Sequence, residues 1–281
     1  MANASGRNRD RTEGLSELPD AAGVRHEPAP AARIVSLVPS LTELLFDLGL
    51  GDQVVGRTAF CIHPAGRVRA AKSVGGTKTV RLEKLRRLEP THVLVNVDET
   101  PRALAQELAA EGWTVVVTHP IEVADNLPLY RLIGGLFDRV REAEELCRRF
   151  EDAHAALQQA AAAQPAQRVL YLIWKDPWMT VSRDTYVSRM LALAGLHTLP
   201  AVSEARYPVI ALDEALLEAC EQILFATEPF PFGERHLDQF RARRPAHADK
   251  ARLIDGEMVS WYGSRAIAGL AYLARFIASD R

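Results

Sequence analysis

The chain has 281 residues, 48% of them apolar and 25% charged, with a formal net charge of −2. This length is too great for one small core and fits two compact lobes of roughly 100 to 130 residues each. The nearly balanced charge produces no strong field toward nucleic acid or an anionic membrane, so we expect neither as a partner.

The cysteines and the N-terminus predict a reducing location. Cys61, Cys147 and Cys220 are odd in number and have no CxxC spacing, so reduced thiols are expected rather than a disulfide framework. Residues 1–32 are polar, contain no apolar run of the length that a signal peptide or a membrane span needs, and are predicted to form a disordered tail. As written, the chain is therefore expected in the cytoplasm, and a misassigned start would make the periplasm the alternative.

The ordered part is predicted to begin at Arg33 with a strand, a turn at Val38-Pro39 and an amphipathic helix. Ser40 and Glu43 have the spacing of a capping box at the start of that helix. Helix and strand patterns then alternate through residues 82–118, as a parallel sheet requires. We expect an N-terminal α/β lobe over residues 33–121.

The same plan recurs in the second half of the chain. RVLYLIW parallels RIVSL, MLALAGL parallels LLFDLGL, and LDEALLEACEQILFAT parallels LEKLRRLEPTHVLVNV, all in the same order. The pattern favours an internal duplication, although a generic α/β rhythm could produce it. A C-terminal α/β lobe is expected over residues 166–281.

Residues 122–165 lie between the two predicted lobes. The stretch 140–163 lacks Gly and Pro and is rich in good helix formers, which predicts one continuous helix of roughly 36 Å at about 1.5 Å per residue. The expected fold is therefore α/β, with two Rossmann-like lobes bridged by a single long helix. A helical crossing of this kind would limit hinge closure.

Cys61 and His63 are candidate metal ligands because they stand two residues apart in FCIHP, so both side chains would point to one side of an extended segment. The alternative is a buried Cys61 that packs as a small apolar residue beside a His63 bonded to backbone. In the following loop, Thr77 and Lys78 could present a hydroxyl and an ammonium group to an anionic ligand, and a tight turn is the alternative.

Aromatic and charged residues follow several predicted strands, where ligands bind in open α/β sheets. Such positions suit a planar or apolar ligand with oxygen groups, and burial in local core is the alternative for the aromatic residues. No dinucleotide, zinc-ribbon or hydrolase motif is present. The candidate ligand-binding residues of this group are Trp174, Trp178, Arg206, Tyr207, Glu228, Trp261 and Arg265.

Several segments together resemble one known family. They are RIVSLVPSLTELLFDLGLGDQVVGR (33–57), FCIHP (60–64), VGGTK (74–78), LEKLRRLEP (82–90), IWKDPWM (173–179), RYP (206–208) and SWYGSR (260–265). The chain resembles the helical-backbone metal receptor superfamily, which contains the cobalamin and ferric-siderophore receptors of ABC transporters. The resemblance runs from Arg33 to the C-terminus and implies the class III periplasmic-binding-protein fold.

The resemblance also implies how such a protein works. A ligand would lie in the cleft between the lobes, with Phe60, Thr77 and Tyr207 at the positions that cover a corrin ring, and Thr77 is small and polar. One acidic residue per lobe would dock on a permease, and the matching positions are Glu83 and Asp213.

The expected function is non-catalytic binding of a metal chelate or corrinoid. We expect a monomer without a membrane span, and an ABC-transporter permease is a possible partner. The ligand itself is not identified by the sequence. One alternative is an intracellular carrier or sensor of a metal complex that is unrelated to transport. The other is a metal-dependent enzyme that uses Cys61, His63 and Glu228.

Overall fold

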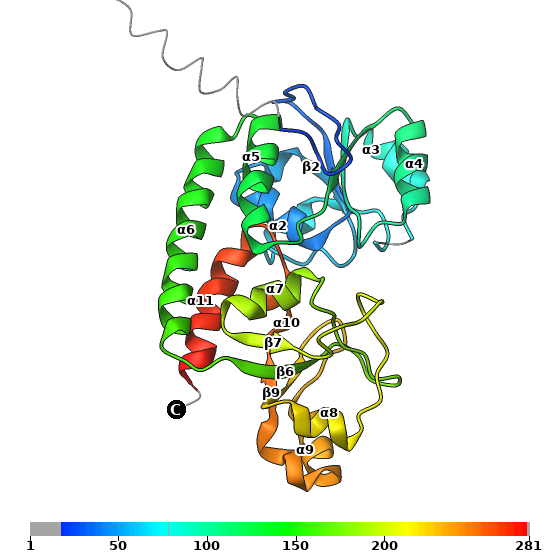
Figure 1. Ribbon diagram of the computed structural model, residues 1–281. Coiled ribbons are helices and arrows are strands. Elements are labelled where there is room, and N and C mark those ends of the chain that lie inside the picture. The colour runs from blue at the N-terminus through cyan, green and yellow to red at the C-terminus, as the bar shows by residue number, and fades with distance from the viewer. Residues whose placement is uncertain (1–17, 78, 280–281) are drawn as a thin grey trace, which may run out of the picture. The chain divides into compact units, whose positions relative to one another are not determined.

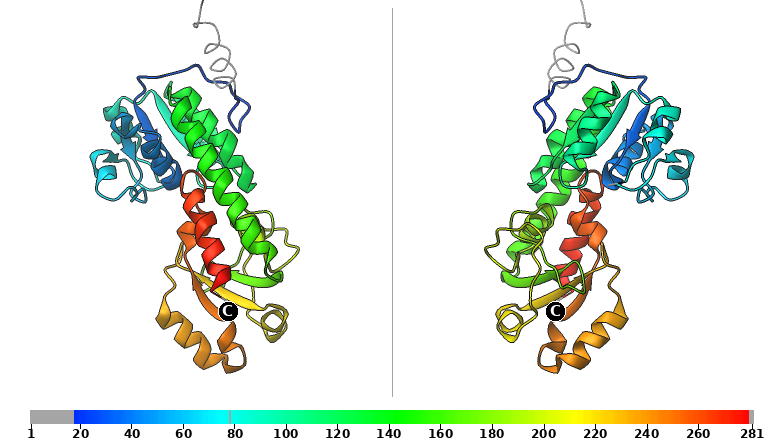
Figure 2. Two further views of the ribbon diagram at one scale, coloured as in Figure 1. Left: turned by 90° about the vertical axis from the view of Figure 1, so that its left-hand side faces the viewer. Right: turned by 90° about the vertical axis from the view of Figure 1, so that its right-hand side faces the viewer.

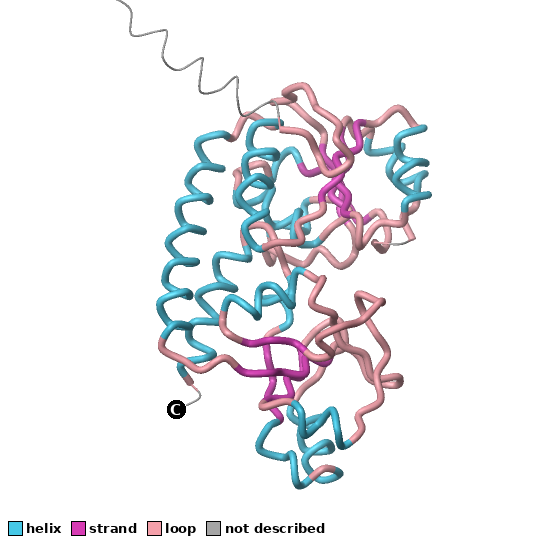
Figure 3. Tube along the Cα trace, viewed as in Figure 1, coloured by secondary structure: helices cyan, strands magenta, loops and turns pink. Residues whose placement is uncertain are grey.

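The computed structural model of the chain describes residues 18–77 and 79–279. Contacts divide the chain into two compact units. Unit 1 consists of the described part of Met1–Pro120 with Ala124–Arg149 and Tyr262–Ser264, and unit 2 consists of Ile121–Val123, Phe150–Trp261 and the described part of Arg265–Arg281. Figure 3 shows the strands gathered into two separate sheets. The predicted α/β class with two sheets is confirmed.

Unit 1 is built on a parallel sheet of five strands in the order β3-β2-β1-β4-β5. The strands are β1 (Ile34–Ser36), β2 (Val54–Arg57), β3 (Lys72–Ser73), β4 (His92–Asn96) and β5 (Thr114–Thr118). The helices of this unit are α2 (Pro39–Asp47), α3 (Leu82–Leu88), α4 (Arg102–Ala110) and α5 (Asn126–Leu136), with short 3₁₀ turns at Gly51–Gln53, Arg67–Ala70 and Val123–Asp125.

Side chains alternate between the two faces of the sheet in unit 1, and helices pack on both faces. Val35 and Val93 pack in one cluster with Leu85 of α3 and Leu108 of α4. Their chain neighbours, such as Leu94, must point to the opposite face because side chains alternate along a strand. Figure 1 shows α3 and α4 on one side of this sheet and α2 and α5 on the other. Both faces are covered, as a parallel sheet requires.

The start of α2 differs from the predicted capping box. The helix begins at Pro39, with Val38 as its N-cap and no side-chain capping bond, so Ser40 already lies inside the first turn. Proline is well suited to the first helical position because its missing N–H has no helical partner there and its φ is already helical. The proline therefore determines where the helix begins, and the prediction of a Ser40–Glu43 box was wrong.

The segment before Arg33 differs from the predicted tail where the structure describes it, from residue 18 onward. Asp20 is buried, and its carboxylate accepts hydrogen bonds from the backbone N–H groups of Ala22 (2.9 Å), Val24 (2.9 Å) and Val117 (3.0 Å). The backbone of Ala21 donates to the carbonyl of Val117 at 2.8 Å. The segment from residue 18 onward therefore covers the edge of β5, although its composition supports no core of its own. Residues 1–17 lie outside the described range.

Unit 2 is built on a parallel sheet of four strands in the order β7-β6-β8-β9. The strands are β6 (Gln167–Leu172), β7 (Leu196–Thr198), β8 (Gln222–Ala226) and β9 (Ala251–Ile254). The helices are α7 (Tyr186–Leu193), α8 (Glu214–Ala219), α9 (Glu234–Arg243), α10 (Gly256–Ser260) and α11 (Arg265–Ala278), with a 3₁₀ turn at Pro245–Lys250.

One face of this sheet carries an aromatic core. Leu172 and Phe225 pack with Phe232, Leu237 and Phe240, so α9 is held against the sheet through its buried side. Figure 1 shows α8 and α9 on one side of the sheet and α7, α10 and α11 on the other.

The two sheets repeat one strand order. With the two-residue edge strand β3 left aside, β2-β1-β4-β5 in unit 1 and β7-β6-β8-β9 in unit 2 are both arranged as second, first, third and fourth strand of a parallel set. The paired sequence segments occupy corresponding places, since α2 follows β1 as α7 follows β6, and α3 precedes β4 as α8 precedes β8. This agreement supports the internal duplication over a generic α/β rhythm.

The long helix predicted for residues 140–163 is α6, Val140–Ala162. Figure 2 shows it in green as one continuous helix. Residues as far as Arg149 are assigned to unit 1, and those from Phe150 onward are assigned to unit 2. The sequence boundaries at 121 and 166 therefore differ from the contact boundaries, which divide the helix itself.

A second difference from the predicted boundaries lies near the C-terminus, where Tyr262–Ser264 belongs to unit 1. The backbone N–H of Gly263 donates to Asn126 Oδ1 at 2.6 Å, and its carbonyl accepts from the Tyr130 hydroxyl at 2.8 Å. Asn126 and Tyr130 are fully buried, so these bonds satisfy polar groups that water does not reach.

We predict that Asp20→Ala lowers the free energy of unfolding by about 1–3 kcal/mol, because three backbone N–H groups lose their acceptor. Urea unfolding of the variant and the wild type measures the difference. Asp152→Ala, on an exposed position of α6, is the control and should change stability by less than about 0.5 kcal/mol. Equal stability of Asp20→Ala and wild type would contradict the role assigned to Asp20.

Candidate functional site

In unit 1, exposed apolar side chains follow the carboxyl ends of neighbouring strands. Phe60 is 61% exposed and Ile62 is also exposed, in the loop after β2, and the exposed Val97 directly follows β4. Large apolar residues are normally buried, so their exposure at this edge of the sheet is informative. These three residues form the surface that we call edge 1.

The two predicted loop motifs of unit 1 lie together. The backbone N–H of Ala59 donates to the carbonyl of Gly75 at 2.7 Å, and a Cβ placed on Gly76 would lie 3.5 Å from the Phe60 ring. Thr77 and His63 are both half-buried in these loops. Lys78 lies outside the described residues.

Cys61 does not lie on this surface. Its side chain is fully buried, and its sulfur is 3.1 Å from the hydroxyls of both Thr42 and Thr58. Burial raises the pKa of the Cys61 thiol, although the two hydroxyl contacts act in the opposite direction. The thiol is therefore protonated at neutral pH. The burial of Cys61 favours the alternative of a packed thiol over that of a ligand-binding or metal-ligating residue, because FCIHP turns its cysteine into the core while Phe60 stays outside.

In unit 2, the hairpin after β6 carries a second exposed surface. Trp174 pairs with Met179, and Met179 pairs with Val209, in two antiparallel bridges. Trp174 is 41% exposed, Tyr207 is 43% exposed and Val209 is exposed. We call Trp174, Tyr207 and Val209 edge 2, since the hairpin that carries Trp174 begins at the carboxyl end of β6 and the segment 206–210 pairs beside it.

Trp178 faces a different part of unit 2 from Trp174. Trp178 lies in the turn between the paired residues Trp174 and Met179. The Trp178 indole stacks on Phe232 with ring centroids 6.1 Å apart and an interplanar angle of 6°. Trp174 instead contacts Phe230 edge to face at 5.6 Å. Phe230 and Phe232 lie 4.5 Å apart between their ring centroids, so the two tryptophans contact different members of one aromatic cluster.

Glu228 is held by donors from α10 and the residue after it. Its Oε1 accepts hydrogen bonds from Ser260 Oγ at 3.0 Å and from Trp261 Nε1 at 2.5 Å. Burial raises the pKa of the Glu228 carboxyl, and the two hydrogen bonds oppose that shift because they favour the charged form. A Cβ on Gly256 would lie 2.8 Å from the Glu228 backbone nitrogen, so α10 packs directly on this residue.

The predicted anion-binding arginines have partners within the protein. Arg265 forms an ion pair with Glu257 at 3.2 Å and lies over the Trp261 ring at 5.0 Å from its centroid. Arg206 Nε donates to the carbonyl of Asp184 at 2.8 Å. Both guanidinium groups therefore have a structural role in unit 2.

Sequence reasoning missed a buried polar group in unit 1. The Tyr262 hydroxyl donates to Glu99 Oε1 at 2.9 Å, and burial together with the Glu99 charge raises the pKa of the Tyr262 phenol well above its ordinary value. Tyr262 belongs to the motif SWYGSR, but nothing in that motif identifies Glu99 as the hydrogen-bond partner of its hydroxyl. The contact joins positions 163 residues apart.

The two predicted docking residues differ in their surroundings. Glu83 is exposed in the first turn of α3. Asp213 is the N-cap of α8, and its Oδ1 accepts from the backbone N–H of Leu216 at 2.9 Å. The neighbouring Glu214 lies 2.5 Å from His247 Nε2. The local role of Asp213 is thus helix capping.

Within residues 18–77 and 79–279, no group of three or more His, Cys, Asp or Glu side chains is arranged to hold a metal ion. In the same described part of the chain, no helix has both the length and the apolar character needed to cross a membrane.

Comparison with known proteins places these features in a family. A family model described as periplasmic binding protein matches residues 34–249. A vitamin B12-binding protein of Vibrio cholerae serotype O1 is 28% identical over 207 residues, which are 72% of this chain and 72% of that protein.

Solved structures agree on the fold. The periplasmic vitamin B12 binding protein BtuF of Vibrio cholerae has a TM-score of 0.75 at 20% identity, covering 90% of this chain and 100% of that one. The periplasmic heme-binding protein RhuT from Roseiflexus sp. RS-1 has a TM-score of 0.76 at 23% identity, covering 89% and 98%. The predicted class III periplasmic-binding-protein fold is confirmed.

We predict that Cys61 resists thiol reagents in the folded protein, because it is buried and its thiol is protonated. Labelling with a disulfide reagent, followed by peptide mass analysis, should show modification of Cys61 on the order of 100-fold slower in native buffer than in urea. Labelling of the Cys61 peptide at similar rates in both conditions would show that the thiol is accessible after all.

The raised pKa of Glu228 predicts a pH-dependent stability difference between wild type and Glu228→Gln. The folded state binds this proton more tightly than the unfolded state, so the carboxyl's contribution is present below its unfolded pKa and is lost as pH rises through the folded pKa. The unfolding free energy of wild type minus that of the variant should therefore decrease from acid to neutral pH in urea titrations. Glu218→Gln, an exposed glutamate of α8, controls for the loss of one charge. An increase of the difference toward neutral pH would contradict the assignment.

Proposed function

Since this chain belongs to the periplasmic binding protein family, we propose that it binds a corrinoid or a related planar metal complex and delivers it to an ABC transporter. The membership confirms the prediction of a binding protein rather than an enzyme. The observation that carries the ligand proposal is the exposure of flat and apolar side chains at edge 1 and edge 2, represented by Phe60, Trp174 and Tyr207.

The chemistry of these two surfaces supports a planar ligand. Phe60, Trp174 and Tyr207 offer rings whose faces can stack on a conjugated macrocycle, and Ile62 and Val209 add aliphatic surface. Ligand sites are lined mainly by apolar and aromatic residues with a few polar groups, which His63 and Thr77 can supply at edge 1. Cys61 has no part in this proposal.

The relatives narrow the ligand class. The Vibrio cholerae protein that matches 207 residues is named for vitamin B12, and several solved structures of the same fold are described as heme-binding, among them BhuT with two hemes. Corrin and porphyrin are both conjugated rings around a metal ion. We therefore take a corrinoid as the first candidate and heme as the second, with the half-buried His63 as the proposed imidazole ligand for heme iron.

The transport role extends the proposal to a location and a partner. BtuF and RhuT are described as periplasmic, which supports the periplasmic alternative over the cytoplasmic expectation. Docking on a permease would use Glu83, whose carboxylate is exposed, and Asp213. Asp213 also caps α8, so its contribution would come from the carboxylate oxygen that does not accept from Leu216.

Binding of cyanocobalamin and of hemin by the purified protein tests the proposal. We predict that one of them binds the wild type at a one-to-one ratio, and that Phe60→Ala and Tyr207→Ala each weaken it by roughly five- to hundredfold. Each loss of affinity corresponds to about 1–3 kcal/mol of binding free energy, because the stacking area of one ring is removed. Isothermal titration measures the affinities, and circular dichroism checks that each variant is folded.

Val24→Ala is the matched control, because Val24 is an exposed apolar residue that lies at neither edge. It should bind as the wild type does. If neither compound binds, the ligand class is wrong. If one binds but Phe60→Ala and Tyr207→Ala leave its affinity unchanged while folded, the two edges are not the site.

A further inference from the structure

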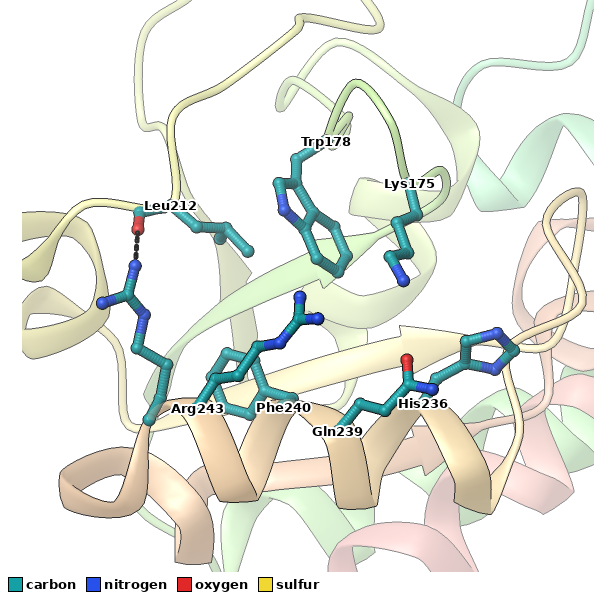
Figure 4. Close-up of a pocket in the computed structure, with 8 residues that line it drawn as sticks. Lys175, Trp178, Leu212, His236, Gln239, Phe240 and Arg243 are labelled. Atoms are coloured by element: carbon teal, nitrogen blue, oxygen red, sulfur yellow. Dashed lines mark hydrogen bonds between the residues drawn. The ribbon is translucent and has the colours of Figure 1, made fainter.

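A pocket of about 340 Å³ lies within unit 2, apart from the residues of edge 2. Figure 4 shows it between α9 and the hairpin that follows β6. Ligand pockets for small molecules typically measure roughly 300–1,000 Å³, so this one has room for a small organic molecule. Its lining residues are Lys175, Trp178, Leu212, His236, Gln239, Phe240, Arg243 and Arg244.

The polar lining of this pocket is positively charged. Lys175, Arg243 and Arg244 contribute three cations, and none of the eight lining residues carries a carboxylate. Figure 4 shows the Arg243 guanidinium and the Lys175 amino group both directed toward the space beside the Trp178 ring. Like charges that converge without an acidic partner favour binding of an anion.

The acidic residues near these cations in sequence do not line the pocket. Asp176, which follows Lys175, is exposed. Asp213 accepts from the backbone N–H of Leu216 at the N-terminus of α8, and Asp238 lies 3.7 Å from Arg241 on α9. Arg244 is fixed because its Nη2 donates to the Leu212 carbonyl at 3.2 Å.

His236 adds a hydrogen-bond donor in its neutral form. Its Nδ1 accepts from the backbone N–H of Gly233 at 3.1 Å at the start of α9. A neutral imidazole carries one proton, so this bond places the proton on Nε2. The amide of Gln239 lies one turn further along the same helix.

The apolar lining of the pocket is mainly aromatic, and its rings pack against the buried core of unit 2. Trp178 stacks on Phe232 and meets Phe225 edge to face at 6.3 Å, while Phe240 meets the same Phe225 at 5.4 Å. Phe225 and Phe232 belong to the buried core of unit 2. The indole is therefore held in one orientation, which lowers the entropic cost of stacking a planar group on it.

We propose that this pocket is a second binding site, which takes a small aromatic anion whose carboxylate or sulfonate group is held by Lys175 and Arg243 while its ring packs along Trp178. The cations supply charge-assisted hydrogen bonds, and the indole and Leu212 supply the apolar contact. This site uses none of the residues of edge 1 or edge 2, so it does not depend on the metal-complex ligand proposed above.

The probe is 1-naphthoate, which combines a planar ring system with one carboxylate, and its binding is measured by isothermal titration to the full chain. We expect saturable one-to-one binding to the wild type and at least tenfold weaker binding to Arg243→Gln. Arg235→Gln removes the same charge from an exposed position of α9 that does not line the pocket, and it should bind as the wild type does. The neutral analogue 1-naphthalenemethanol should bind at least tenfold more weakly than the acid.

Location is tested separately from affinity, so that a variant with altered folding does not decide the outcome. In hydrogen exchange, naphthoate should slow the backbone amides of residues 174–178 and 236–244 in the wild type. Protection elsewhere, equal weakening by Arg243→Gln and Arg235→Gln, equal affinity for the alcohol, or absence of saturable binding would each overturn the proposal. Arg243→Gln should leave the affinity for cyanocobalamin or hemin unchanged, and loss of that affinity would show that the two sites are one.

Discussion

The structure depends throughout on parallel strand pairing. Every described strand pair in both sheets is parallel, so all the strands of a sheet end at the same edge. The chain must return across a face between strands, and it does so through an α-helix in every connection except β2–β3, which has a 3₁₀ turn. This constraint covers both faces and leaves the carboxyl edge as the place where loops can differ without disturbing the core. Phe60, Val97 and Trp174 are exposed in the segments that follow the strands, whereas equally apolar residues inside the strands are buried.

Fold and site were not equally predictable from the sequence. Continuous apolar strands such as VLV at 93–95 and ILF at 223–225 are typical of parallel sheets, and a stretch without Gly or Pro predicted α6 correctly. Such signals are local. The position of a side chain inside or outside a loop depends on distant contacts, and Cys61 shows this clearly, since the hydroxyls of Thr42 and Thr58 take it into the core while the adjacent Phe60 remains outside.

Other differences have the same origin. Asp20 lies in a stretch whose composition predicts no structure, yet its carboxylate accepts backbone hydrogen bonds from Val117 at the edge of β5 and from Ala22 and Val24 in its own turn. Trp174 and Trp178 have the same chemistry and lie four residues apart, but Trp174 is 41% exposed beside Phe230, whereas Trp178 stacks on Phe232 and packs against the core of unit 2. Sequence identified the residue types suited to a ligand, and tertiary pairing decided which surface each one serves.

The placement of Tyr262–Ser264 in unit 1 affects when unit 1 can be completed during synthesis on the ribosome. Asn126 and Tyr130 are synthesised well before Gly263, which supplies the N–H and the carbonyl that they bind. While the nascent chain is still shorter than 263 residues, unit 1 lacks the two hydrogen bonds to Gly263. Unit 1 is thus completed only after nearly all of unit 2 has been made, and an N-terminal fragment that ends before Gly263 would lack both bonds.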